Sequence, residues 1–125
     1  MTSYRNQSVI NGIAKSEGVS NEVAEQYFEG ALQFLEVAST ASKPVSPSRP
    51  VDAAWHAFIL HTADYANYCQ ERFGRFIHHK PTRTCDPELY MEARNLVHER
   101  FGPLNAAIWH QPEASECGST CDALE

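Results

Sequence analysis

The stretch from Pro50 to Pro81, PVDAAWHAFILHTADYANYCQERFGRFIHHKP, decides the fold of this chain. Proline is favoured in the first turn of a helix, and Asp52 just behind it favours a helix start. Gly74 is suited to the left-handed position that ends a helix. Between these two ends, apolar residues recur at helical spacing around Trp55. The pattern therefore predicts helical structure over residues 50–74.

This predicted helix has one candidate break, at His61-Thr62, where Thr62 can cap a second helix with Asp64 in its first turn. If the helix is straight, a core stripe runs along it, composed of Trp55, Ile59, Thr62, Ala66, Cys69 and Phe73, with Phe58 and Tyr65 to one side. Residues 75–85 after Gly74 are predicted to form a loop or a short extended piece. Whether the helix breaks at His61-Thr62 determines which histidines can come close to one another.

Two further helices are indicated on either side of this stretch. Apolar residues recur at three- and four-residue steps after Ser20 or Asn21, either of which can cap a helix, and the members of this face are Val23, Tyr27, Phe28, Ala31, Leu32, Leu35 and Ala38. The later helix begins with Asp86 as its cap and Pro87 at its first position, and Gly102 followed by Pro103 ends it. Its expected buried face is Leu89, Ala93, Leu96, Val97 and Phe101.

The remaining segments complete an all-α fold, a small single-domain helical bundle over residues 1–111. Val9, Ile10 and Ile13 form an apolar cluster that indicates a short helix or an ordered arm. Residues 39–49 are a Pro-rich connector, expected to wrap the surface in extended form. Residues 112–125 are polar and small, and we expect a flexible, cysteine-containing tail.

Composition restricts the classes of function. The 125 residues carry 16 acidic against 10 basic side chains, a formal net charge of -6, which argues against nucleic acid as a partner and favours a basic protein partner. No apolar run approaches the length of a membrane span, so a membrane role is not expected. We expect a cytosolic protein whose four cysteines stay reduced unless they bind metal or perform redox chemistry. The oligomeric state is not encoded in any of these features.

Four of the six histidines lie in the opening stretch, and they are the candidate metal ligands. Asp52 and His56 are four residues apart on one flank of the helix, so the carboxylate can fix the imidazole tautomer. His61 lies on the opposite flank and can converge with His56 only if the helix breaks. One of His78 and His79 points inward if their segment is extended and folds back onto the helix.

These positions predict a metal site formed by His56 and by His78 or His79, with Asp52 as a ligand or as the group that positions one. Zinc is favoured, because nitrogen and sulfur donors suit it, and iron is the alternative if carboxylates join. Cys69 lies inside the expected core stripe, where a small buried side chain is the simpler interpretation. No His-Glu-x-x-His, paired Cys-x-x-Cys or similar ligand motif is present.

A second candidate site lies near the C-terminus. His110, Cys117 and Cys121 are close enough in sequence to supply an imidazole and two thiolates to a soft metal. The two cysteines, four residues apart, can instead close a small disulfide. The third interpretation is that they are incidental residues of a mobile tail.

The opening stretch resembles the core of the glycine-rich domain-containing protein-like family. The positions that carry the resemblance are Val51, Asp52, Trp55, His56, Thr62, Tyr65, Cys69, Phe73, Gly74 and His78 or His79. This resemblance covers about a quarter of the chain, and it implies a helical domain without indicating catalytic residues. The glycine-rich region for which the family is named has no counterpart in this chain.

Three functions remain open at this point. The first is a metal-binding or histidine-rich accessory domain without turnover of its own, in which Asp52 orients His56 and His78 or His79 completes the site. The second is a protein-interaction module or inhibitor whose acidic surface docks a basic partner. The third is a metal-dependent enzyme that uses the same residues with an open coordination position.

Overall fold

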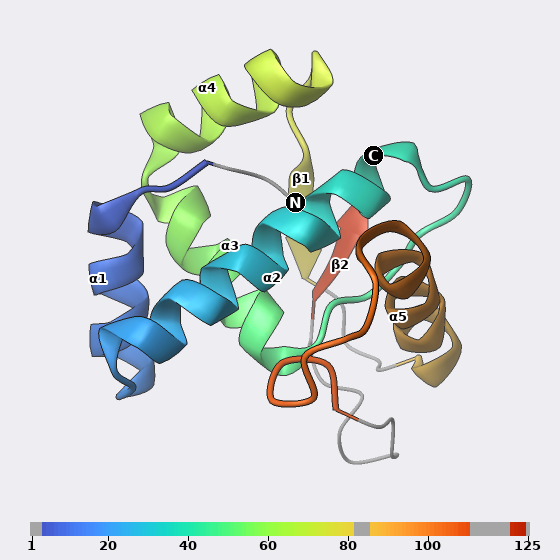
Figure 1. The fold of residues 1–125 in the computed structure, drawn as a ribbon. Helices are drawn as coiled ribbons and strands as arrows, with labels where there is room; N and C mark the ends of the chain where they lie inside the picture. Colours follow the sequence, from blue (N-terminus) through green and yellow to red (C-terminus); the bar gives the residue numbers. More distant parts are fainter. Residues whose placement is uncertain (1–3, 82–85, 111–120, 125) are drawn as a thin grey trace.

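The computed structural model of the protein describes residues 4–81, 86–110 and 121–124. Within them lie five helices and two short strands (Figure 1). In chain order these are α1 (Gln7–Glu17), α2 (Asn21–Thr40), α3 (Arg49–Leu60), α4 (Thr62–Phe73), β1 (His78–Pro81), α5 (Pro87–Phe101) and β2 (Cys121–Leu124). The predicted all-α class is confirmed. The segment around Val9 is a helix, capped by the side chain of Asn6, which accepts from the Val9 amide.

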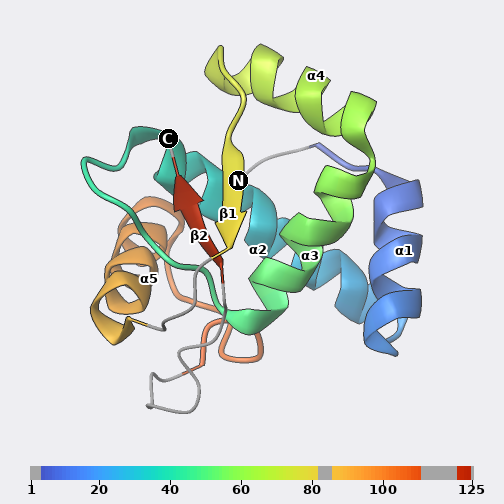
Figure 2. The same ribbon diagram turned by 180° about the vertical axis from the view of Figure 1, so that it is seen from behind.

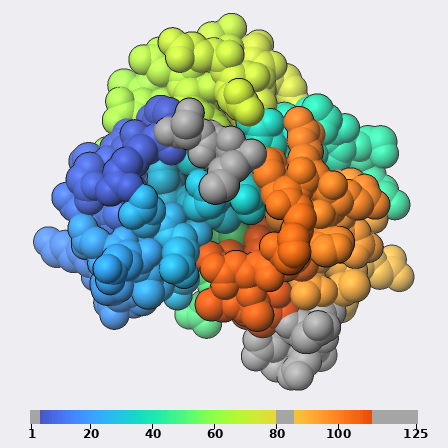
Figure 3. Space-filling view, in the orientation of Figure 1, coloured from blue at the N-terminus to red at the C-terminus, as the bar shows by residue number. Residues whose placement is uncertain are grey.

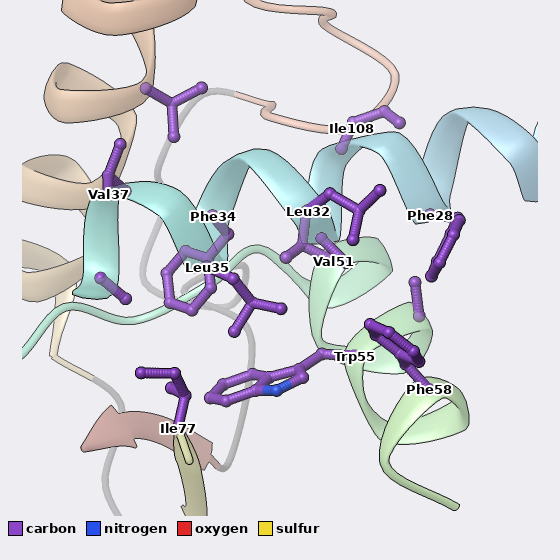
Figure 4. Close-up of a cluster of buried hydrophobic side chains, with 14 of the residues drawn as sticks. Phe28, Leu32, Phe34, Leu35, Val37, Val51, Trp55, Phe58, Ile77 and Ile108 are labelled. Atoms are coloured by element: carbon purple, nitrogen blue, oxygen red, sulfur yellow. The ribbon is translucent and has the colours of Figure 1, made fainter. Parts of the chain in front are cut away.

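Helix α2 is the centre of the molecule. It begins where the sequence predicts, with the Ser20 hydroxyl accepting from the Val23 amide, and it packs against α1, α3 and α5 (Figures 1 and 2). The predicted apolar face is correct but incomplete, because Phe34 and Val37 on the other side are buried as well. A helix enclosed from several directions buries more than one stripe of residues. Figure 4 shows the cluster that results, with side chains of α2 meeting Trp55 and Phe58 of α3.

The connector between α2 and α3 does not lie on the surface throughout. Val45 is fully buried, Ser46 and Ser48 are buried beside it, and the Ser46 amide donates to the Leu89 carbonyl of α5 over 3.3 Å. The expectation of a connector that only wraps the surface is therefore wrong for these residues. The Ser48 hydroxyl also accepts from the Val51 amide, so the connector ends as the cap of α3.

The chain breaks at His61, which is both the C-terminal cap of α3 and the N-terminal cap of α4. The two helices form a corner without a linker, as Figure 2 shows for α3 and α4. Beyond this corner the predicted core stripe is wrong for Thr62 and Ala66, which are exposed, and right for Cys69, which is buried. The buried side of α4 consists of Tyr65, Tyr68 and Cys69. Gly74 ends α4 in the left-handed conformation, with φ of 74°, as predicted.

Helix α5 has the predicted ends, since Asp86 accepts from the Glu88 amide and Gly102 terminates it. The chain beyond α5 then turns back so that Ile108 and Trp109 are buried against the core. Gly30 of α2 permits this approach: a Cβ atom there would lie 3.0 Å from Ile108 and 3.1 Å from Val51. The contact holds α2, α3 and the segment after α5 together at one point.

Strands β1 and β2 pair antiparallel, with His79 opposite Ala123 and His78 opposite Leu124 (Figure 2). The sequence pattern predicts an extended piece at His78 but no partner for it. Residues 121–124, in the segment where we expect a flexible tail, provide that partner, whereas residues 111–120 and 125 lie outside the described part of the chain.

No helix in the described ranges is both long enough and apolar enough to cross a membrane.

Candidate functional site

A buried hydrogen-bond chain fixes the start of β1 against α3 and α4. The indole N–H of Trp55 donates to the Tyr65 hydroxyl over 2.9 Å, and that hydroxyl donates to the Ile77 carbonyl over 2.5 Å. All three residues are almost fully buried, and Figure 4 shows Trp55 and Ile77 beside each other in the core. Burial raises the pKa of Tyr65 far above its usual value, so the hydroxyl keeps the proton that it donates. The Ile77 backbone, and with it the next two residues, is held over Trp55.

His79 is placed by this arrangement on Asp52. Its Nε2 atom lies 2.8 Å from Oδ1 of Asp52, and the two side chains are only 9% and 22% exposed. The imidazole also packs on the Trp55 ring, with centroids 4.1 Å apart. An ionised carboxylate only accepts, so Nε2 carries a hydrogen and donates it. In the neutral ring, Nδ1 of His79 is then left with a free electron pair.

His56 is the other imidazole at this position. It lies on α3 one turn after Asp52, is exposed, and has its ring centroid 6.1 Å from that of His79. His78 belongs to the opposite face of β1, because neighbouring strand residues alternate, and its ring lies 4.8 Å from that of Phe76. The structure therefore brings together Asp52, His56 and His79, and it leaves His78 apart.

The role expected for Asp52 needs one correction. The i, i+4 spacing on α3 predicts that its carboxylate orients His56, whereas its hydrogen-bond partner is His79. The cause is the fold of β1, which delivers a buried imidazole to Asp52, while His56 remains turned to solvent. Spacing within one helix carries no information about a strand that arrives from elsewhere.

Within the described residues, no three side chains of His, Cys, Asp or Glu are close enough to hold a metal ion together. Asp52, His56 and His79, called the histidine cluster below, thus supply two imidazoles and one carboxylate, and that carboxylate is already hydrogen-bonded to His79. For the second candidate site, His110 lies beside Tyr90, with ring centroids 6.2 Å apart. Cys117 lies outside the described residues, and Cys121 is the first residue of β2.

Cys69 is a fully buried free thiol. Burial raises its pKa, so the thiol stays protonated and is a poor ligand for a metal. It lies in the core next to Tyr65, in agreement with the simpler interpretation of this residue as a small buried side chain.

His61 makes two hydrogen bonds that the sequence does not predict. His61 lies with Nδ1 3.1 Å from the Ala57 carbonyl and Nε2 3.2 Å from the Ser8 hydroxyl. A carbonyl only accepts, so Nδ1 carries the hydrogen and Nε2 accepts from Ser8. The two residues are more than fifty positions apart, and no spacing rule connects them. The contact ties α1 to the α3–α4 corner.

A family model described as UCP032817-like matches residues 4–97 of the chain, which is well over half of its length. No curated protein and no solved structure gives a match. The resemblance to the glycine-rich domain-containing protein-like family is therefore wrong. It rested on residues 50–81 alone, whose motif specifies a local helix–corner–strand framework, whereas the matching model extends from before α1 into α5.

Proposed function

We propose that this chain, which belongs to the UCP032817-like family, binds a divalent transition-metal ion through His56 and His79. The observation that carries the proposal is the hydrogen bond from His79 Nε2 to Asp52 Oδ1, which leaves Nδ1 of His79 as a ligand atom. A carboxylate behind a ligating imidazole fixes its tautomer and strengthens it as a donor. All three residues lie within the range that the family model matches.

The separation of the two rings supports a shared ion. Two imidazoles on one tetrahedral zinc ion, each with a Zn–N distance of about 2.0 Å, have ring centroids about 5 Å apart. The centroids of His56 and His79 are 6.1 Å apart. His79 is held by Asp52 and Trp55, but His56 is exposed and can rotate about its own side-chain bonds to close the difference of about 1 Å.

A site with two imidazoles leaves coordination positions for water or for groups of another molecule. We propose zinc rather than iron, because both ligand atoms are nitrogens and Asp52 is engaged by His79. The function is that of a small metal-binding accessory domain, without a catalytic group assigned to it. A cytosolic location accords with the free thiol of Cys69.

Zinc titration of metal-depleted protein tests the proposal. By isothermal titration calorimetry the full chain should bind about one equivalent of zinc, and His56→Ala or His79→Ala should abolish that event. Asp52→Asn should weaken binding by about ten- to a hundredfold, because the carboxylate acts through His79. Binding should also weaken between pH 7.5 and pH 5, since a protonated imidazole cannot ligate.

His98→Ala is the matched control, because His98 is an exposed histidine on α5, away from the cluster. It should bind zinc like the unaltered protein. Far-ultraviolet circular dichroism of each variant separates loss of zinc from loss of folding. Zinc binding that survives in the folded His56→Ala and His79→Ala variants, or no binding to the unaltered protein, would refute the proposal.

A further inference from the structure

A cavity of about 490 Å³ lies between α2 and the segment that follows α5. Its two walls meet on the face shown in Figure 3, where α2 in light blue borders residues 101–109 in orange. None of the histidine cluster lines it. The size lies within the range of pockets that hold small molecules or a few residues of a bound peptide.

One wall of this cavity is apolar. It consists of side chains from the end of α5 and from the turn beyond it, namely Val97, Phe101, Leu104, Ile108 and Trp109. Ile108 and Trp109 are buried, whereas Phe101 and Leu104 remain partly open to solvent. An apolar side chain of a ligand can be taken out of water against this wall, which is the main source of affinity for such pockets.

The opposite wall is acidic. Glu22, Glu25 and Glu29 project from successive turns of α2, and burial, with Glu25 as a neighbour, raises the pKa of Glu29. Glu25 is ion-paired with Arg5. In the described part of the chain neither Glu22 nor Glu29 has an Arg or Lys partner. A partly desolvated carboxylate gains from direct contact with a basic group of a ligand.

Trp109 also lines the cavity. Its side chain is almost fully buried, and its indole N–H is closed off from solvent and has no hydrogen-bond partner among the described residues. What this residue offers a ligand is therefore apolar surface. The two walls together require cationic groups and an apolar group.

We propose that this cavity binds a basic, apolar peptide segment of a protein partner, with lysine or arginine side chains on Glu22 and Glu29 and an apolar side chain against Phe101 and Leu104. A peptide carries basic and apolar side chains on one backbone, and in an extended peptide they can point to opposite sides, so that it contacts both walls at once. The net charge of -6 attracts such a segment over longer distances.

The spacing of the carboxylates sets the spacing of the basic residues. Glu22 and Glu29 are seven residues apart on one helix face, which corresponds to about 10 Å along α2. In an extended peptide, side chains alternate between two faces, so lysines two positions apart share a face at about 7 Å, and their long side chains span the remaining difference of about 3 Å. The matching probe is a fluorescein-labelled peptide of eight residues in which Lys and Leu alternate.

Fluorescence anisotropy of this peptide with the full chain tests the proposal. The unaltered protein should bind it, and the same peptide with glutamate in place of lysine should not bind. The double variant Glu22→Gln with Glu29→Gln should weaken binding by about tenfold, which corresponds to two partly exposed ion pairs.

The matched control is Glu17→Gln with Glu71→Gln, which changes the net charge equally but at exposed positions outside the cavity. This control should bind like the unaltered protein. Equal weakening in the control and in the cavity variant would overturn the proposal in favour of general charge attraction. So would absence of binding, or sedimentation showing a dimer whose formation depends on Phe101 and Leu104, in which case a second copy covers the cavity.

Discussion

At the scale of single residues, Tyr65 connects the fold to the candidate metal site. Its hydroxyl accepts a hydrogen bond from the Trp55 indole N–H and donates one to the carbonyl of Ile77, two residues before His79. Neither end of this chain has another partner within the described residues. Tyr65 therefore acts as a bridge between α3 and β1 rather than only as an apolar core residue.

Tyr65→Phe should destabilise the protein by about 2 to 4 kcal/mol. The substitution leaves a buried N–H and a buried carbonyl unpaired, at about 1–3 kcal/mol each. Urea unfolding followed by circular dichroism measures the change. Tyr27 is a partly buried tyrosine whose hydroxyl has no hydrogen bond to any of the described residues, so Tyr27→Phe should stay within about 0.5 kcal/mol of the unaltered protein. Similar losses in both variants would show that the hydroxyl chain is not the cause.

Glu29 should make the protein less stable at neutral pH than at acidic pH. Burial raises the pKa of Glu29 in the folded state above its value of about 4.5 in the unfolded state, so between these two pKa values the folded state binds more protons than the unfolded state. The contribution of Glu29 to the free energy of unfolding therefore falls as the pH rises through this range. Glu29→Gln should therefore raise the urea midpoint at pH 7 and leave the midpoint unchanged near pH 3.

The matched variant for this comparison is Glu17→Gln, at an exposed carboxylate on α1. It should change the urea midpoint equally little at both pH values. If Glu29→Gln lowered the urea midpoint at pH 7, the ionised carboxylate would be stabilising the folded state, which would contradict the destabilising effect that we expect from its burial.

At the scale of helices and strands, two residues of α2 join it to its neighbours. Gly30 allows close approach of Val51 and Ile108, and the buried carboxylate of Glu36 pairs with Arg72 of α4 and with Arg100 of α5, the latter at 3.5 Å. Gly30 has no side chain to separate the packed elements, and Glu36 places a charge at a buried position where a hydrophobic residue is usual. Both join α2 to elements distant in sequence.

Gly30→Ala should lower the free energy of unfolding by up to about 2 kcal/mol. Alanine is the better helix former by up to about 1 kcal/mol, but its Cβ atom would lie 3.0 Å from Ile108, and overpacking of a core costs about 1–3 kcal/mol. Gly12→Ala on α1 is the matched control, because no atom lies within 4 Å of a Cβ there. It should raise stability by about 0.5 to 1 kcal/mol in the same urea experiment.

At the scale of the whole molecule, the helical class and most helix ends follow from the sequence alone. Ser20, Gly74, Asp86 and Gly102 mark ends because caps are local, and a local pattern contains all that is needed to recognise them. The burial of Phe34 was missed, because it depends on which elements surround α2. Hydrophobic periodicity identifies one apolar face of a helix, but it does not show how many other elements pack around that helix.

The histidine cluster shows the same limit. The sequence marks Asp52, His56 and the pair His78-His79 as chemically notable, and the structure brings three of these side chains together. Which of the two adjacent histidines turns inward depends on the alternation of β1 and on the Ile77 anchor, both of which follow from tertiary contacts. The contact between Ser8 and His61 had no signal in the sequence.

The corner at His61 has a consequence for the energetics of any ligand at His56 and His79. Helices α3 and α4 share one capping residue, and the Tyr65 hydroxyl connects both to Ile77 just before β1, so tertiary contacts hold the backbone around the two imidazoles. The entropy lost in ordering that backbone is spent during folding, and an arriving ion has only the exposed imidazole of His56 left to immobilise. We therefore expect an ion that binds at this scaffold to do so without a folding transition.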